Sequence, residues 1–105
     1  MKLSIASFFA RFVCLIPIIL VAKPIYAYDE LDLQKLLTTR ICNDCNLIQA
    51  NLDSRNLNDV SLFGANLRKT NLVSANLRGA ELIGVDLTDA NLTGADLTGT
   101  DLTGA

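Results

Sequence analysis

Residues 45–104 read CNLIQ ANLDS RNLND VSLFG ANLRK TNLVS ANLRG AELIG VDLTD ANLTG ADLTG TDLTG. Leucine recurs in this stretch at every fifth residue, from Leu47 to Leu102, and divides it into twelve units. We call the leucine position i. Position i−2 is usually Ala, position i−1 is Asn, Asp, Ser or Glu throughout, and every glycine of the chain stands at i+2. The unit therefore reads A-(N/D)-L-x-G.

A period of five fits neither of the common secondary structures. Five residues of an α-helix advance about 500°, so successive leucines would drift around the axis and form no apolar stripe. In one extended strand, an odd period would send successive leucines to opposite faces. The chain must therefore bend once per unit. Positions i−2 and i share one side of a short extended segment and are expected to point inward, while the glycine at i+2 permits a tight corner.

This pattern resembles the pentapeptide repeat family, whose consensus A-(D/N)-L-x-x is met here almost unit by unit. The resemblance implies that four units form one coil of a right-handed quadrilateral parallel β-helix, so that twelve units form about three coils. Successive coils are then expected about 4.8 Å apart, the ordinary distance between strands. The expected fold class is an all-β solenoid, with residues 45–105 as the pentapeptide repeat β-helix.

The first 27 residues have a different composition. Lys2 and Arg11 are basic, residues 12–22 form an uninterrupted apolar run, and the segment ends at the small residue Ala27. This arrangement predicts a secretory signal peptide over residues 1–27. A retained membrane anchor is the alternative, but eleven apolar residues are fewer than the roughly 20 needed to span a bilayer. We therefore expect export to the periplasm, to a thylakoid lumen or out of the cell.

Residues 28–44 are expected to form an N-terminal cap with a short helix over 29–37. Asp29 can serve as the N-cap, and acidic residues in the first turn lie beside the positive helix end. Leu33, Leu36 and Leu37 fall on one face, which is expected to cover the open end of the β-helix. A helix that binds a partner is the alternative. After removal of the signal peptide, the chain would carry 6 basic and 11 acidic residues, so its net charge would be 6 − 11 = −5.

The repeat register makes the pair Cys42 and Cys45 informative. Counting back from Leu47 places Cys42 at position i and Cys45 at i−2, so both are expected to point inward. In an exported chain with an even number of cysteines after cleavage, a disulfide between them is plausible. A zinc site is a weaker alternative, because it needs about four ligands and the chain has no histidine. A thioredoxin-like redox motif is also a weaker alternative, because such a motif belongs at the start of a helix in an α/β fold, whereas this pair leads into a β-solenoid.

If four units form one coil, residues twenty apart stack on the outside. Phe63 and Ile83 then lie together at the outward i+1 position and form the best candidate for a lateral contact surface. Lys69 and Asp89 are expected to form a weak surface ion pair. Two further features are a ladder of asparagines and a stacked pair of acids, formed by Asn51, Asn71 and Asn91 and by Glu81 and Asp101. Arg55 stands at an inward i−2 position and is expected to emerge at the N-terminal rim, because a charge is not buried unpaired.

The sequence contains no recognisable group of catalytic residues, because histidine is absent and the carboxylates follow the structural repeat. We expect no cofactor, no metal and no enzymatic activity, and we expect a structural or protein-binding module with an unknown protein partner. Some members of the resembled family mimic DNA and shield topoisomerase, but a signal peptide would remove this chain from nucleic acid. A thiol redox protein is the third possibility.

The last coil, with Leu102 in it, is an open edge, and we expect a homodimer through this C-terminal coil.

Overall fold

The computed structural model describes residues 26–105. The expected signal peptide over 1–27 therefore lies outside the described residues, apart from its last two. Within the described part of the chain, no helix has the length and apolar character needed to cross a membrane.

Helix α2 spans Glu30–Thr39. Asp29 is its N-cap, and the Oδ1 atom of Asp29 accepts hydrogen bonds from the backbone N–H groups of Leu31 at 2.8 Å and Asp32 at 3.4 Å. These bonds satisfy two of the free donors at the start of the helix. Arg40 ends the helix in the left-handed conformation, with φ of 61°. The N-cap expected from the sequence is confirmed, and the helix continues two residues beyond Leu37.

From Ile41 onward the chain winds into stacked coils. Each residue at i−1 forms a single parallel pair with the residue twenty positions later, from Ile41 with Ser61 to Glu81 with Asp101. Twenty residues are four units, so each coil has four sides, and the expected four-sided parallel arrangement is confirmed. Three complete coils (41–60, 61–80 and 81–100) are followed by one further side at 101–105. The described residues contain these isolated pairs and no longer strands.

The corners of the coil have one recurrent backbone conformation. The residue at i+2 has a positive φ in every unit, from 56° at Asp44 to 70° at Gly104. A hydrogen bond from the N–H of the next i−2 residue to the carbonyl at i closes the turn, as between Ala50 and Leu47 at 3.1 Å. Residues other than glycine adopt this conformation at Gln49 and Lys69. The fold thus imposes the left-handed conformation even where the side chain makes it unfavourable.

Backbone hydrogen bonds join each coil to the next. The N–H at position i donates to the i−1 carbonyl one coil later, as from Leu52 to Asn71 at 2.8 Å. The i−1 N–H of the later coil donates back to the i−2 carbonyl, as from Asn71 to Ala50 at 3.0 Å. Together with the corner bonds, these contacts pair most backbone groups inside the stack, which is required where water is excluded.

The interior consists of the inward side chains at i and i−2. Eight leucines in succession are buried, and they are Leu47, Leu52, Leu57, Leu62, Leu67, Leu72, Leu77 and Leu82. Burying a leucine side chain stabilises a fold by about 1.5–3 kcal/mol. Within residues 26–105, Thr70 is the one polar residue that is buried. Its Oγ1 atom donates to the carbonyl of Leu47 at 2.7 Å. This hydroxyl bond satisfies the polar atom and links the first coil to the second.

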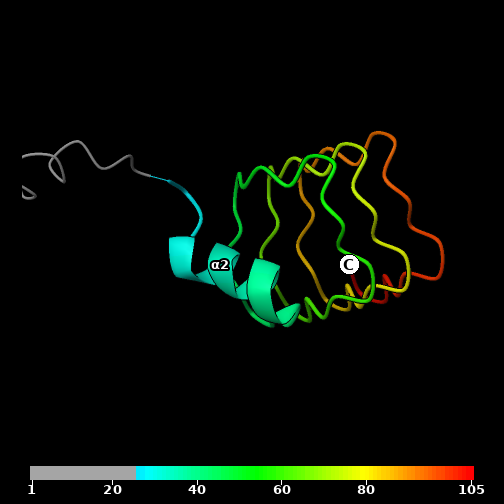
Figure 1. Cartoon of the computed structure of the whole chain (residues 1–105), viewed down its shortest axis with the longest axis horizontal. Coiled ribbons are helices and arrows are strands. Elements are labelled where there is room, and N and C mark those ends of the chain that lie inside the picture. The colour runs from blue at the N-terminus through cyan, green and yellow to red at the C-terminus, as the bar shows by residue number, and fades with distance from the viewer. Residues whose placement is uncertain (1–25) are drawn as a thin grey trace, which may run out of the picture.

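Helix α2 covers the end of the stack at which the first coil begins (Figure 1). Leu36 is buried against the core and Leu33 is partly buried, whereas Leu37, expected on the same face, is 38% exposed. The helix also pairs polar groups of the rim. The N–H of Asn46 donates to Oδ2 of Asp32 at 2.8 Å, and the carbonyl of Asn46 accepts from the N–H of Asp29 at 3.0 Å.

Candidate interaction surface

The four sides of the solenoid form four faces, each named here after one residue. The Phe63 face comprises 41–45, 61–65, 81–85 and 101–105. The other three are the Arg68 face (46–50, 66–70 and 86–90), the Val73 face (51–55, 71–75 and 91–95) and the Arg78 face (56–60, 76–80 and 96–100). On each face, the outward residues at i−1 and i+1 form two columns along the solenoid axis, because pairs twenty residues apart are in register.

The Phe63 face carries Phe63 and Ile83, which the sequence predicted as an exposed apolar pair, and also Ile41. Phe63 is 52% exposed and Ile41 is 55% exposed, while Ile83 is half-buried. Phe63 and Ile83 occupy the i+1 column in consecutive coils. Below them Asn43 is fixed, since its Oδ1 atom accepts from Ser61 Oγ at 2.9 Å and from the N–H of Phe63 at 3.0 Å. Asn43 therefore links the first coil to the second directly beneath Phe63.

The i−1 column of the same face ends in two acids. Glu81 and Asp101 form a parallel pair and lie in neighbouring coils. The hydroxyl of Thr103 and its backbone N–H both donate to Oδ1 of Asp101, at 2.6 and 3.0 Å. These bonds hold the pKa of Asp101 below its ordinary value. Asp101 therefore remains ionised at neutral pH. The stacked acids expected from the sequence, Glu81 and Asp101, lie in the column beside Phe63 and Ile83.

The ion pairs of the described residues lie on other faces. Arg68 lies 3.7 Å from Asp86 on the Arg68 face, and Arg78 lies 3.4 Å from Asp96 on the Arg78 face. Both pairs join an i+1 residue to the i−1 acid of the next coil. The expected pair between Lys69 and Asp89 is not among them and was wrong. Both of those residues occupy i+2 corners with positive φ, whereas the observed pairs use the two outward columns.

The other expectations about the outside were met in part. Asn71 donates to Oδ1 of Asn51 at 3.2 Å, so the asparagine ladder forms between the first two coils. Arg55 is exposed, as expected. The role of Arg40 was not predicted from the sequence. Its Nη2 atom donates to the carbonyl of Asn58 at 2.6 Å and to the Asn58 side chain at 2.8 Å, at the rim of the first coil.

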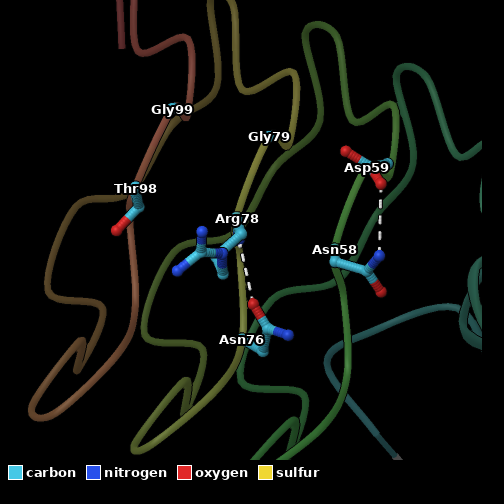
Figure 2. Close-up of a pocket in the computed structure, with 7 residues that line it drawn as sticks. All are labelled: Asn58, Asp59, Asn76, Arg78, Gly79, Thr98 and Gly99. Atoms are coloured by element: carbon cyan, nitrogen blue, oxygen red, sulfur yellow. Dashed lines mark hydrogen bonds between the residues drawn. The ribbon is translucent and has the colours of Figure 1, made fainter.

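A shallow groove of about 470 Å³ lies on the Arg78 face (Figure 2). Its lining is polar and comprises Asn58, Asp59, Asn76, Arg78, Gly79, Thr98 and Gly99. Most of the polar atoms already have partners. The N–H of Arg78 bonds Asn76 at 3.1 Å, and Asn58 bonds Asp59 at 3.2 Å. Two glycine corners line the groove, and most of its polar groups are already hydrogen-bonded within the chain, so few are free to bind a ligand.

Cys42 and Cys45 lie side by side beneath helix α2, and a disulfide joins them in the structure, with Cα atoms 5.4 Å apart. Their exposed fractions are 0% and 3%, and Sγ of Cys42 lies 3.1 Å from the carbonyl oxygen of Asp32. The corner bond from Cys45 to Cys42, at 3.4 Å, is the same as in other units. The repeat turn itself thus brings the two cysteines together.

The leucines of the last four units are less well covered than those before them. Leu92 and Leu97 are partly buried, and Leu102 is 40% exposed. Within the described residues, Leu102 is the only leucine of the repeat classed as a large exposed apolar side chain. Within residues 26–105, no three Cys, Asp or Glu side chains lie close enough together to hold a metal ion.

Four-sided coils of five-residue units around a filled leucine core define a solenoid repeat protein of the parallel β-helix class. A comparison with protein families matches residues 41–79 and 70–105 to the pentapeptide repeats, in eight copies. The chain therefore belongs to the pentapeptide repeat family, whose members form a right-handed β-helix. The family identified from the sequence is confirmed.

Solved structures of the same family resemble this chain. One is a pentapeptide repeat protein from the cyanobacterium Cyanothece 51142, with 39% identity and a TM-score of 0.57 over 58% of this chain. Another is a pentapeptide repeat protein from the Arabidopsis thaliana thylakoid lumen, with 32% identity and a TM-score of 0.53 over 58% of this chain. This chain covers 42% of the length of each. No curated protein matches the sequence.

Proposed function

We propose that this chain is a non-enzymatic, exported interaction module that binds a protein partner through an outer face of its β-helix. The observation that carries the proposal is the division of side chains. The inward positions are filled by leucine and alanine, as at Leu72 and Ala75, which are fully buried. A filled interior offers no internal site for a substrate, whereas regular outward columns present side chains at fixed spacing.

Export is part of the proposal. The support is the basic and apolar segment over 1–27 and the location of one relative, the protein from the Arabidopsis thaliana thylakoid lumen. The proposed compartments are a thylakoid lumen, the periplasm or the exterior. Intact mass of the protein recovered from the exported fraction tests this. A chain beginning at Tyr28 supports export with cleavage, whereas a mass that retains residues 1–27 points to a tethered protein.

The thiol redox alternative has less support. Catalytic cysteines are partly exposed so that a thiolate can attack its substrate, but Cys42 and Cys45 are covered by helix α2. The alternative of a DNA mimic that shields topoisomerase also has less support. The coil at 61–80 contains Arg68, Lys69 and Arg78 and no acid, so it interrupts any continuous anionic surface that could imitate a phosphate backbone.

A homodimer through the C-terminal coil remains a prediction. Its support is the side chain of Leu102, which is 40% exposed within the described residues, since exposed apolar side chains can be buried against a second chain. The charge distribution opposes it, because residues 81–105 contain five acids and no base. Two such ends would repel each other. Light scattering of the wild type and of Leu102→Lys at matched concentrations tests the dimer.

The direct test of the module is to purify the exported form from its native compartment with any bound protein after mild cross-linking. A stoichiometric partner that is lost from a mutant of one face, and kept in a mutant of another, supports the proposal. Recovery of the protein alone, after cross-linking from every face, would contradict it.

A further inference from the structure

The Phe63 face differs from the other three faces in its charges. It carries Asp44, Glu81 and Asp101 and no basic residue, because its four sides read ICNDC, SLFGA, ELIGV and DLTGA. Each of the other faces contains at least one arginine, at Arg55, Arg68 or Arg78. The described ion pairs lie on the Arg68 and Arg78 faces. The acids of the Phe63 face therefore have no cation of this chain beside them within the described residues.

Apolar and acidic side chains on this face form neighbouring columns. Phe63 and Ile83 follow one another in the i+1 column, and Glu81 and Asp101 follow one another in the i−1 column. The two columns are two residues apart along each side, which is about 6.6 Å, and the coils are about 4.8 Å apart. An apolar stripe and an anionic stripe thus run in parallel along the solenoid axis.

The apolar stripe is partly exposed, since Ile83 is half-buried, and hydrogen bonds hold its backbone at Phe63. Phe63 is 52% exposed, and its backbone N–H is bonded to Asn43 below it. At the same i+1 position, the last four units of the repeat (86–105) have threonine, at Thr88, Thr93, Thr98 and Thr103. The repeat fold therefore does not need an aromatic residue at this position. Phe63 and Ile83 follow one another in one outward column, and it is contiguous apolar side chains of this kind, rather than single ones, that mark contact surfaces.

From these observations we infer that the Phe63 face binds a cationic amphipathic segment of a partner protein. Its apolar side chains lie over Phe63 and Ile83, and its lysine or arginine side chains pair with Glu81 and Asp101. The apolar contact supplies most of the affinity, while the charges fix the orientation and exclude acidic segments. This inference rests on the proposed function, because it names the partner chemistry of an interaction module.

The first experiment uses the mature protein and three synthetic peptides. One peptide has leucines on one helical face with lysines beside them, the second has glutamates in place of the lysines, and the third has serines in place of the leucines. Binding is followed by fluorescence anisotropy and mapped by NMR chemical shifts. We expect only the leucine–lysine peptide to bind, with the largest shifts at Phe63, Ile83 and Glu81. Equal binding of the glutamate peptide, or shifts on another face, overturns the inference.

Matched variants separate this site from general acidity. Phe63→Thr introduces the residue that the repeat itself uses at i+1, and Val73→Thr makes the same kind of change on the Val73 face. Asp101→Asn and Asp96→Asn remove one charge each from equivalent i−1 positions. We expect Phe63→Thr to weaken peptide binding more than about fivefold and Asp101→Asn about two- to fivefold. The control variants leave it unchanged. Equal effects of Asp101→Asn and Asp96→Asn would show nonspecific attraction and overturn the inference.

The second experiment distinguishes failure of the inference from failure of the proposed function. A photoreactive amino acid is placed at position 63 or at position 73 of the exported protein, and cross-links are formed in the native compartment. We expect one partner to be cross-linked from position 63, at a segment containing lysine or arginine. Cross-linking only from position 73 overturns the inference and leaves the interaction module standing. No cross-link from either position contradicts both.

Discussion

The carboxylate of Asp59 lies over Gly79 one coil later, where it takes the space that a Cβ atom of residue 79 would need. Both residues stand at the i+2 corner of the Arg78 face, and both have positive φ. The corner above Asp59 therefore favours glycine for two reasons, because glycine adopts this backbone conformation without strain and leaves room for the carboxylate. Asp44 and Gly64 repeat the arrangement on the Phe63 face.

Gly79→Ala is expected to destabilise the protein more than Gly84→Ala. Both glycines have φ of +67°, so both variants bear the strain of a left-handed alanine, about 1 kcal/mol. Only the alanine at 79 meets Asp59, since nothing lies within 4 Å of a Cβ atom at 84. Urea denaturation of both variants measures the difference. Adding Asp59→Ala to Gly79→Ala should remove the excess; if it does not, the contact with Asp59 is not the cause.

A second prediction compares one repeat position at two places in the stack. Leu72 is fully buried in the middle coil, whereas Leu102 is 40% exposed in the last side. Leu72→Ala should lower the free energy of unfolding by about 2–5 kcal/mol, because it removes buried methyl groups and leaves a cavity. Leu102→Ala should cost less than about 1 kcal/mol. Thermal and urea unfolding measure both. Equal losses would mean that Leu102 is covered in solution, as in the predicted homodimer.

The sequence predicted the coil better than the faces. The core residues were predictable because leucine at a strict period of five can form a continuous core only if every unit turns its leucine inward. The N-cap at Asp29 was predictable from the residues next to it. The partners of surface charges were not predictable from the register alone. Arg68 reaches diagonally to Asp86, whereas Lys69 and Asp89 stack in register at corners and form no pair. The direction in which a long side chain leans depends on its position within the unit.

The role of the corner residue also needed the structure. Glycine at i+2 correctly indicated a tight corner, and the structure shows that φ is positive there. Lysine and glutamine at this position gave no such signal, because the unfavourable backbone is imposed by hydrogen bonds to the neighbouring coils. In the same way, Arg40 follows the helix and its sequence context does not show that it binds the carbonyl of Asn58. Contacts between residues far apart in sequence decide such roles.

A third prediction concerns acid. In the later part of the stack, the i−1 residues Asp86, Asp96 and Asp101 each accept the hydroxyl and the N–H of the threonine two residues later. The threonine hydroxyl bond is the main reason that the pKa of each of these aspartates is lowered in the folded protein, with Arg68 and Arg78 contributing at Asp86 and Asp96. Asn91 occupies the same position with the same bonds and does not titrate.

A carboxyl whose folded pKa is depressed contributes stability that is present above its unfolded pKa and is lost as the pH falls through the folded value. The loss should therefore begin near the ordinary aspartate pKa of about 4 and continue below it. We expect the urea midpoint to fall with pH in this range. The triple variant Asp86→Asn, Asp96→Asn and Asp101→Asn should show a flatter profile. A slope equal to that of the wild type would assign the acid sensitivity to other carboxyls.

The last prediction concerns Cys42 and Cys45, which the structure places beneath helix α2 with almost no exposure. We expect unreduced, denatured protein from the exported fraction to resist alkylation, and reduced protein to take up two labels.

Because the disulfide is covered, a small thiol should reduce it in the native state only when the helix opens. Leu36→Ala removes the buried side chain that anchors the helix, so it should speed reduction several-fold. Leu31→Ala changes a residue that is 78% exposed on the same helix and should leave the rate unchanged. Two free thiols in the unreduced protein would show that the cysteines only pack in the core, and equal rates for both variants would show that the bond is reached without movement of α2.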